Sequence, residues 1–197
     1  MQYSSIQDAW LSAHNHDDFV GNIHPCTWMD VFTWIEQIPL FPKVIWHSRE
    51  ENCVYFAVGS TSDTTQPLQF HVRSFDPNEP QWTGFPATKT IRPQHVVQWT
   101  TDTCTLRSVS NGESIPMENG LDPQDSPELP SKGQWTKKIE HCKRLFEETD
   151  IKKIVLARQS TFQLDSPWRK FKEIYDAQPH CYHFLVQPSV ERCFFGA

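Results

Sequence analysis

The chain of 197 residues is longer than one average domain of about 150 residues and too short for two. Its 13 Phe and 8 Trp outnumber its 7 Gly, which predicts a core of large aromatic side chains and argues against a glycine-rich loop for nucleotide phosphates. The formal net charge of −6 supplies no positive field for a phosphate backbone, so nucleic acid is not expected as a partner.

The sequence predicts neither a membrane span nor a secretory signal. The longest fully apolar run, residues 53–58, is far shorter than the roughly 20 residues that a spanning helix needs. The N-terminus lacks a basic start followed by an apolar stretch, so a cytoplasmic location is expected. The six cysteines are widely spaced and form no CxxC pair, which favours free thiols over a disulfide framework or a zinc site.

The first predicted elements are helical. Residues 1–42 are mostly helical by pattern, and within them Thr27 and Asp30 form a capping-box-like start. Apolar residues recur on one face of the helix that follows. We expect this helix to end near Ile38, before Pro39.

Two β-hairpins are predicted after this helix. Residues 44–47 and 53–59 are rich in β-branched and aromatic side chains and flank a polar stretch. Residues 95–100 and 103–109 form the second predicted hairpin, with a polar turn between the strands. A shorter extended piece is expected within residues 68–75, so a sheet occupies the middle of the chain.

A linker and an amphipathic helix come next. Residues 111–132 carry several prolines and acidic residues, which predicts a linker or a long surface loop. The helical spacing of Trp135, Ile139, Cys142 and Phe146 then indicates a helix with one apolar face.

The last third of the chain alternates strands and a helix. Residues 151–157 form a short apolar run that predicts a strand buried on both sides. A helix is expected to begin at Ser166 as N-cap, with Pro167 at its first position. Two final strands are predicted over residues 181–186 and 191–195.

This order of elements predicts an α+β fold with antiparallel sheets and flanking helices rather than a regularly alternating parallel sheet. We expect an N-terminal helix-plus-sheet subdomain over residues 1–110, a linker or surface loop over 111–132, and the start of a second domain over 133–197. An apolar strand that runs into the last residue suggests a larger fold that has been cut, and a genuine C-terminal edge strand is the alternative.

Lys153 is the main candidate for chemistry. It adjoins the apolar run 154–157, and burial of that strand would favour the neutral amine, which can act as a general base toward water. The alternative is that Lys152 and Lys153 simply flank the end of a strand, with their ammonium groups in solvent.

Three other groups of reactive side chains are better explained by solvation or packing. An N-terminal group of histidines and aspartates fits no metal-site spacing and is expected to be solvated. His180 and His183 flank Cys181 without an identifiable orienting acid, so packing is expected. Glu50 and Glu51 lie in a predicted turn, where solvated charges are usual. The N-terminal group consists of His14, His16, Asp17, Asp18 and His24.

Residues 135–197 resemble the chorismate-binding enzyme family and, within it, the isochorismate synthases. The resemblance is carried by the helix that begins at Trp135, by Lys-Ile-Val-Leu-Ala-Arg at 153–158, by the aromatic strand 181–187, and by Phe-Phe-Gly-Ala at 194–197. Parts of the N-terminal region, such as residues 41–46, agree more loosely.

The resemblance implies a chorismate-binding fold like that of anthranilate synthase component I, in which chorismate and Mg²⁺ bind between two large sheets. It implies an isomerase of menaquinone biosynthesis that adds water at C2 of chorismate while the C4 hydroxyl leaves. The same resemblance places the water-activating base at Lys153. Salicylate synthases, which further eliminate pyruvate, are a close alternative.

The sequence also departs from the family. In the family, the Gly-Ala pair continues into Ser-Pro-Glu, whose glutamate is the general acid, and the magnesium-binding glutamates lie further on. These positions are absent here, so the chorismate-binding domain within 133–197 is expected to be truncated, without metal ligands and inactive alone. The alternative is a non-catalytic remnant or a subunit that needs a separate C-terminal half and associates through an exposed sheet edge.

Overall fold

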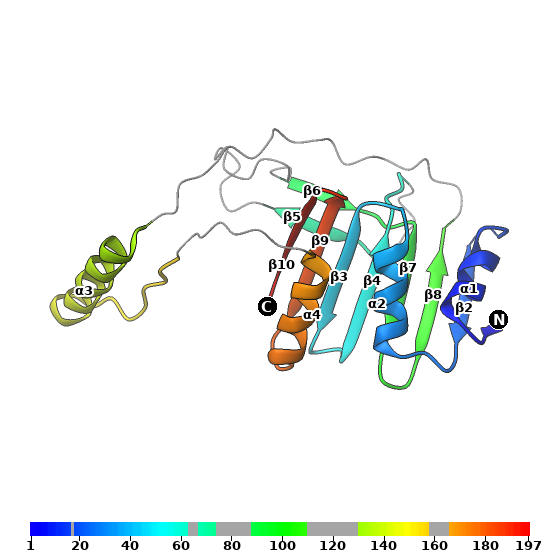
Figure 1. The fold of residues 1–197 in the computed structure, drawn as a ribbon, viewed down its shortest axis with the longest axis horizontal. Helices are drawn as coiled ribbons and strands as arrows, with labels where there is room; N and C mark the ends of the chain where they lie inside the picture. Colours follow the sequence, from blue (N-terminus) through cyan, green and yellow to red (C-terminus); the bar gives the residue numbers. More distant parts are fainter. Residues whose placement is uncertain (17, 63–66, 74–87, 110–129, 158–165) are drawn as a thin grey trace. The chain divides into compact units, whose positions relative to one another are not determined.

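An eight-stranded sheet forms the centre of the fold (Figure 1). The computed structural model describes residues 1–16, 18–62, 67–73, 88–109, 130–157 and 166–197. All neighbouring strands run antiparallel except the first pair, which is parallel. The spatial order is β1 (Gln2–Tyr3), β2 (Phe19–Ile23), β8 (Cys104–Ser108), β7 (His95–Trp99), β4 (Cys53–Val58), β3 (Lys43–Ser48), β9 (His183–Ser189) and β10 (Arg192–Gly196).

Both predicted hairpins are confirmed. In the first, β3 pairs with β4 so that Lys43 lies opposite Val58, and the turn contains Asn52 with a φ of 47°, a conformation that asparagine tolerates better than most residues. In the second, β7 pairs with β8 so that Trp99 lies opposite Cys104. Short-range pairing across a polar turn is therefore the part of this sheet that the sequence pattern predicts best.

Three helices cover one face of the sheet: α1 (Ile6–Ala13), α2 (Trp28–Gln37) and α4 (Pro167–Ala177) (Figure 1). The predicted caps are present. Thr27 and Asp30 form a full capping box at the start of α2, and the Ser166 side chain accepts a hydrogen bond from the backbone N–H of Arg169.

The expectation of mostly helical structure over residues 1–42 needs correction, because β1 and β2 lie within it. In β2, Phe19, Gly21 and Ile23 are buried while Val20 and Asn22 are exposed, which is the period-two alternation of a strand. This strand pairs with β8, far along the chain, so tertiary pairing decides its conformation.

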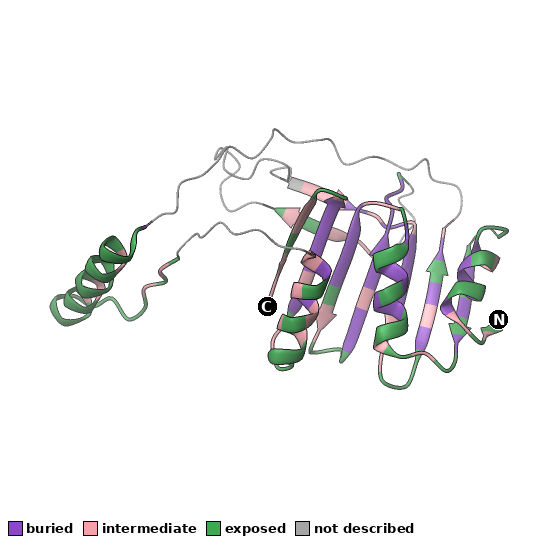
Figure 2. Ribbon diagram, in the orientation of Figure 1, coloured by how far each residue is buried: buried purple, intermediate pink, exposed green. Residues whose placement is uncertain are grey.

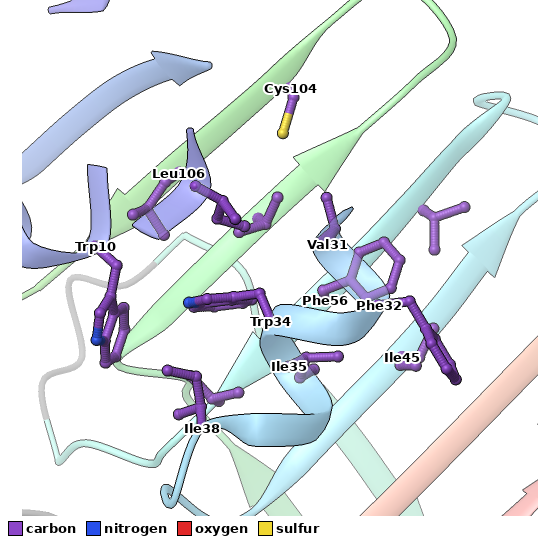
Figure 3. Close-up of a cluster of buried hydrophobic side chains, with 14 of the residues drawn as sticks. Trp10, Val31, Phe32, Trp34, Ile35, Ile38, Ile45, Phe56, Cys104 and Leu106 are labelled. Atoms are coloured by element: carbon purple, nitrogen blue, oxygen red, sulfur yellow. The ribbon is translucent and has the colours of Figure 1, made fainter. Parts of the chain in front are cut away.

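The main core fills the space between the three helices and the sheet. Figure 3 shows side chains of α1 and α2 meeting inward-facing residues of the strands, with Trp10 edge-on to Trp34 at 5.4 Å between ring centroids. Figure 2 shows that burial is concentrated in the central strands, as Ile45 and Phe56, each 0% exposed, illustrate. The composition's prediction of an aromatic core is confirmed.

The opposite face of the sheet carries a smaller apolar cluster. There β5 (Phe70–Arg73) and β6 (Thr88–Ile91) form a separate antiparallel pair. Ile91 of this pair is buried together with Val44, Val96 and Val186 of the large sheet. The predicted extended piece within 68–75 is thus confirmed as β5.

The chain divides into two compact units, residues Met1–Asp122 with Ser166–Ala197, and Pro123–Asp165. This division differs from the expected one, which grouped residues 133–197. The final strands belong with the N-terminal sheet because β9 pairs with β3, for example Leu185 opposite Ile45. No helix formed by the described residues is both long and apolar enough to cross a membrane.

The smaller unit contains the predicted amphipathic helix as α3 (Lys132–Glu148), which begins with a capping box of Ser131 and Gln134. The strand expected at residues 151–157 does not form. Among the described residues this segment pairs with no strand, and a β-strand requires a partner for its backbone N–H and C=O groups. An apolar run in the sequence cannot supply that partner.

Candidate functional site

Lys153 lies in the segment that follows α3, and its side chain is exposed. Helix α3 ends just before this segment, at Glu148, and Thr149 is its C-cap. The Thr149 backbone N–H and its hydroxyl both donate to the Leu145 carbonyl oxygen, at 3.0 and 2.6 Å. The hydroxyl also accepts from the N–H of Ile151 at 3.2 Å, so Thr149 ends the helical hydrogen-bond pattern.

The burial that the sequence predicted around Lys153 is not present in the described residues. Val155 is 78% exposed, and Lys152 and Lys153 are exposed as well. An amine acts as a base only in its neutral form, which burial favours over the charged form. The segment 151–157 by itself therefore gives Lys153 no low-dielectric environment.

A concave surface of about 500 Å³ lies within the same unit, between the start of α3 and Ala157 at the end of the segment 151–157. It is lined by Pro130, Gln134, Lys137, Lys138 and Ala157. Two ammonium groups without a carboxylate in the lining give this surface a positive potential, which suits an anionic ligand. Lys153 belongs to the segment that forms one side of this surface but is not in its lining.

The N-terminal histidines do not converge on one point. His14 Nδ1 lies 2.8 Å from the Trp10 carbonyl oxygen, and its ring stacks against His95, whereas the His16 ring stacks on Phe19. Within the described residues, no group of three or more His, Cys, Asp or Glu side chains could hold a metal ion. Asp17 lies outside the described residues.

A pair of histidines that the sequence did not predict joins β3 to β9. The Nδ1 atoms of His47 and His183 lie 3.2 Å apart, and the Tyr175 ring packs against His183 at 4.7 Å between centroids. Burial lowers the pKa of both imidazoles, and the positive charge of Arg49 lowers the pKa of His47 further. His183 therefore packs in the core, as expected, and its partner is set by the register of two distant strands.

Lys43 is a buried lysine that the sequence pattern did not predict. It is 3% exposed, and its ammonium donates to the Glu36 carbonyl oxygen at 2.8 Å near the end of α2. The same nitrogen lies 5.0 and 5.3 Å from the ring centroids of Phe41 and Trp168. Burial lowers the pKa of Lys43 to about 8, so this fold holds a lysine with a lowered pKa at the start of β3.

The carboxylates of Glu50 and Glu51, in the turn between β3 and β4, accept hydrogen bonds from tyrosines as well as contacting solvent. The Tyr182 hydroxyl donates to Glu50 at 3.1 Å, and the Tyr55 hydroxyl donates to Glu51 at 2.8 Å. Glu51 and Tyr55 also line a cavity of about 520 Å³ on the face of the sheet opposite the helices, with Trp46, Phe184 and other aromatic residues around it.

The comparisons with known proteins agree with this fold. Residues 107–197 match the family described as chorismate binding enzyme. The structure is similar to that of MenF, the menaquinone-specific isochorismate synthase from Escherichia coli, with a TM-score of 0.55 and 17% identity. The likeness covers 98% of this chain and 54% of that chain, so this chain spans about half the length of the solved structure. No curated protein matches the sequence.

At that identity the solved structure shows the fold alone, and the family model is matched by residues 107–197. The predicted α+β chorismate-binding fold is thereby confirmed. Lys153 lies inside the matched residues, and so do α3, α4 and the two final strands.

Proposed function

We propose that this chain forms part of an isochorismate synthase, the member of the chorismate-binding enzymes that adds water at C2 of chorismate while the C4 hydroxyl leaves. The observation that carries the proposal is the family match over residues 107–197, which contains the Lys-Ile-Val-Leu-Ala-Arg segment at 153–158. The MenF-like fold supports the same choice within the family.

In the proposed reaction, Lys153 is the general base. Its neutral amine takes a proton from the attacking water, so that the oxygen gains nucleophilicity as it approaches C2. Because Lys153 is exposed in the described segment, this role requires that the segment be covered in the assembled enzyme, where desolvation would favour the neutral amine.

Chorismate is a dicarboxylate, and the two lysines on α3 that line the surface in the same unit are suited to attract it. Lys137 and Lys138 provide positive charge without a carboxylate in that lining. The family resemblance also implies Mg²⁺, which would neutralise negative charge on the substrate. The described residues do not fit this ion, since no group of three or more His, Cys, Asp or Glu side chains among them could hold a metal.

The test is an assay of the enzyme that contains this chain, with chorismate and Mg²⁺, followed by proton NMR of the products. We expect isochorismate, and we expect Lys153→Ala to lower kcat by about 100-fold or more, the usual contribution of a general base. Lys152→Ala is the matched control, because it removes the neighbouring exposed ammonium, and it should retain activity within a few-fold.

Each other outcome has a clear meaning. Salicylate with pyruvate as products would identify a salicylate synthase instead. Unchanged chorismate in the wild-type assay would contradict a catalytic role and favour a non-catalytic subunit. Equal activities of the Lys153 and Lys152 variants would exclude Lys153 as the base while leaving the family assignment intact.

A further inference from the structure

Two histidines from distant parts of the sequence face each other across the joint between β3 and β9 (Figure 1). In the ladder, His47 lies directly opposite His183. Their Nδ1 atoms are 3.2 Å apart, whereas their ring centroids are 5.5 Å apart and the ring planes differ by only 11°. Two nearly parallel rings whose nitrogens are that much closer than their centroids lie edge to edge in almost one plane. This is the geometry of an N–H···N hydrogen bond rather than of two stacked rings.

The bond limits how many protons the histidine pair, His47 and His183, can hold. A neutral imidazole has one N–H and one lone pair, so the bond uses the proton of one Nδ1 and the lone pair of the other. One extra proton can enter at the Nε2 of the donating ring and leaves the bond intact. A second extra proton has to enter at the accepting Nδ1, where two N–H groups and two positive charges would then face each other. The pair therefore tolerates one positive charge in this geometry and not two.

The environment of the inner histidine adds to this limit. His183 is 0% exposed, and among the described residues its Nε2 is buried with no hydrogen-bond partner of good geometry. Burial lowers the pKa of His183, and the neighbouring His47 lowers it further. The backbone carbonyl groups of Ile174 and Gln178, near the end of α4, act in the opposite direction without reversing the shift of this pKa.

In the part of the chain that the structure describes, no carboxylate shifts the pKa of either histidine. Burial and then the positive charge of Arg49, just beyond the end of β3, lower the pKa of His47. On β4, the residue opposite His47 is the apolar Val54. From α4, the Tyr175 ring contacts both imidazoles, with 5.5 and 4.7 Å between centroids. Burial and the adjacent Asp176 raise the pKa of this tyrosine, so it stays neutral.

We propose that the histidine pair is an acid-sensitive switch, which holds β9 against β3 at neutral pH and lets β9 separate when the pair takes up its second extra proton. The strand order makes this joint important, because β9 is attached to the large sheet through β3 and carries β10 on its other side. Helix α4 is coupled to the same joint through the contact of Tyr175 with His183. Protonation of one buried contact therefore loosens the segment 166–197, in which α4, β9 and β10 lie.

The direction of the pH effect follows from the number of protons bound. A histidine in an unfolded segment takes up its proton near pH 6.5. The closed pair resists the second proton, so below about pH 6.5 the opened segment binds more protons than the closed one. The ratio of closed to open molecules therefore falls as the pH falls, by up to about tenfold per pH unit for each proton excluded. At a pH well above 6.5 both states hold neutral histidines, and the pair contributes no further change.

Hydrogen–deuterium exchange with mass spectrometry, on the 197-residue chain at pH 7.5 and 5.0, tests the proposal. After correction for the intrinsic exchange rates, we expect peptides of β9 and α4 to lose about tenfold or more in protection at pH 5.0. The hairpin of β7 and β8 lies away from the pair in the strand order and should keep its protection within a few-fold. NMR of the ¹⁵N-labelled chain should show a scalar coupling between the two Nδ1 nuclei at pH 7.5 that is lost at pH 5.0.

Two variants separate the pair from a general effect of acid. His47→Asn keeps a polar group near the position of Nδ1 and removes the second charge, so the protection of β9 should stay within a few-fold between the two pH values. His180→Asn is the matched control, because His180 is an exposed histidine shortly before β9, and this variant should lose protection at pH 5.0 as the wild type does.

The proposal is overturned if the wild-type chain protects β9 equally at both pH values, if β7 and β8 lose as much protection as β9, or if His47→Asn shows the wild-type loss at pH 5.0. The absence of a coupling between the two Nδ1 nuclei at pH 7.5 would also overturn it. The exchange profile and the coupling are measured on the wild-type chain, so neither depends on whether a variant folds.

Discussion

Lys43 shows how tertiary contacts change the chemistry of a single residue. It directly precedes the predicted strand over residues 44–47, where a lysine is usually solvated, yet it is 3% exposed and its ammonium lies near the rings of Phe41 and Trp168. Its ammonium donates to the last turn of α2, near the negative end of the helix dipole. The charge is therefore partly compensated, although burial still lowers the pKa of Lys43 to about 8.

This lowered pKa predicts a pH dependence of stability. A lysine in the unfolded chain keeps its proton up to a pH of about 10.4, so between pH 8 and 10.4 the unfolded state binds more protons than the folded state. The free energy of unfolding should therefore rise with pH across this window by up to about 3 kcal/mol from Lys43 alone. Below pH 8 both states are protonated and the contribution no longer changes.

Urea unfolding at several pH values between 7 and 10.5 tests this prediction against Lys43→Met, which keeps the length of the side chain without its charge. The difference in unfolding free energy between the wild type and the variant should increase with pH in favour of the wild type. Other groups that titrate in this range are common to both proteins. If the difference in unfolding free energy between the two proteins stayed constant from pH 7 to 10.5, the pKa of Lys43 would not be lowered in the folded state.

At the scale of elements, local signals predicted where α2 and α4 begin, because their caps could be recognised in the sequence. The capping box of α2 was predicted from Thr27 and Asp30 and is formed in the structure. The Asp30 carboxylate accepts from the Thr27 N–H at 2.7 Å, and the Thr27 hydroxyl oxygen accepts from the Asp30 N–H at 3.2 Å. These contacts connect residues only three positions apart, which is why the sequence suffices.

Removal of this cap should weaken α2 and the sheet that it covers. Thr27→Ala leaves the N–H of Asp30 without its side-chain acceptor, and we expect the free energy of unfolding to fall by about 1 kcal/mol. Met29→Ala is a suitable control in the same turn, because Met29 is 43% exposed, and it should change stability by less than about 0.5 kcal/mol. Chemical denaturation followed by tryptophan fluorescence measures both, and equal losses would argue against the cap.

The segment 151–157 marks the limit of local signals. Its apolar run predicted a buried strand with Lys153 beside it, but among the described residues it pairs with no strand and is mostly exposed. Hydrophobicity indicates that a segment is suited to burial. The tertiary structure determines which other element covers it. The environment of Lys153 could not be predicted from its neighbours in the sequence for this reason.

At the scale of the whole molecule, the final two strands complete a sheet that begins near the N-terminus. Leu185 in β9 is 0% exposed and lies opposite Ile45 in β3 on one side and Phe195 in β10 on the other. Residues 166–197 and the N-terminal sheet therefore share one core. The expected boundary near residue 133 would instead have placed them in separate domains.

Unfolding of Leu185→Ala distinguishes these two divisions of the chain. The substitution leaves a cavity in the shared core, so we expect one cooperative transition that loses about 3 kcal/mol, observed equally by circular dichroism and tryptophan fluorescence. Val190→Ala, at a position that is 75% exposed, should be nearly neutral. If the N-terminal sheet instead kept its wild-type stability in the Leu185 variant, the two parts would be independent domains.

The sequence by itself determined the elements that depend on near neighbours, namely the capped helices and the two hairpins, and the residues that resemble chorismate-binding enzymes. Only the tertiary structure decided which distant strands pair, and with them the contact of His47 with His183 and the burial of Lys43. Caps and tight turns are stabilised by hydrogen bonds within a few residues, which a local pattern can specify. The ionisation and reactivity of a side chain depend on burial and on charges brought from elsewhere in the chain, which no local pattern contains.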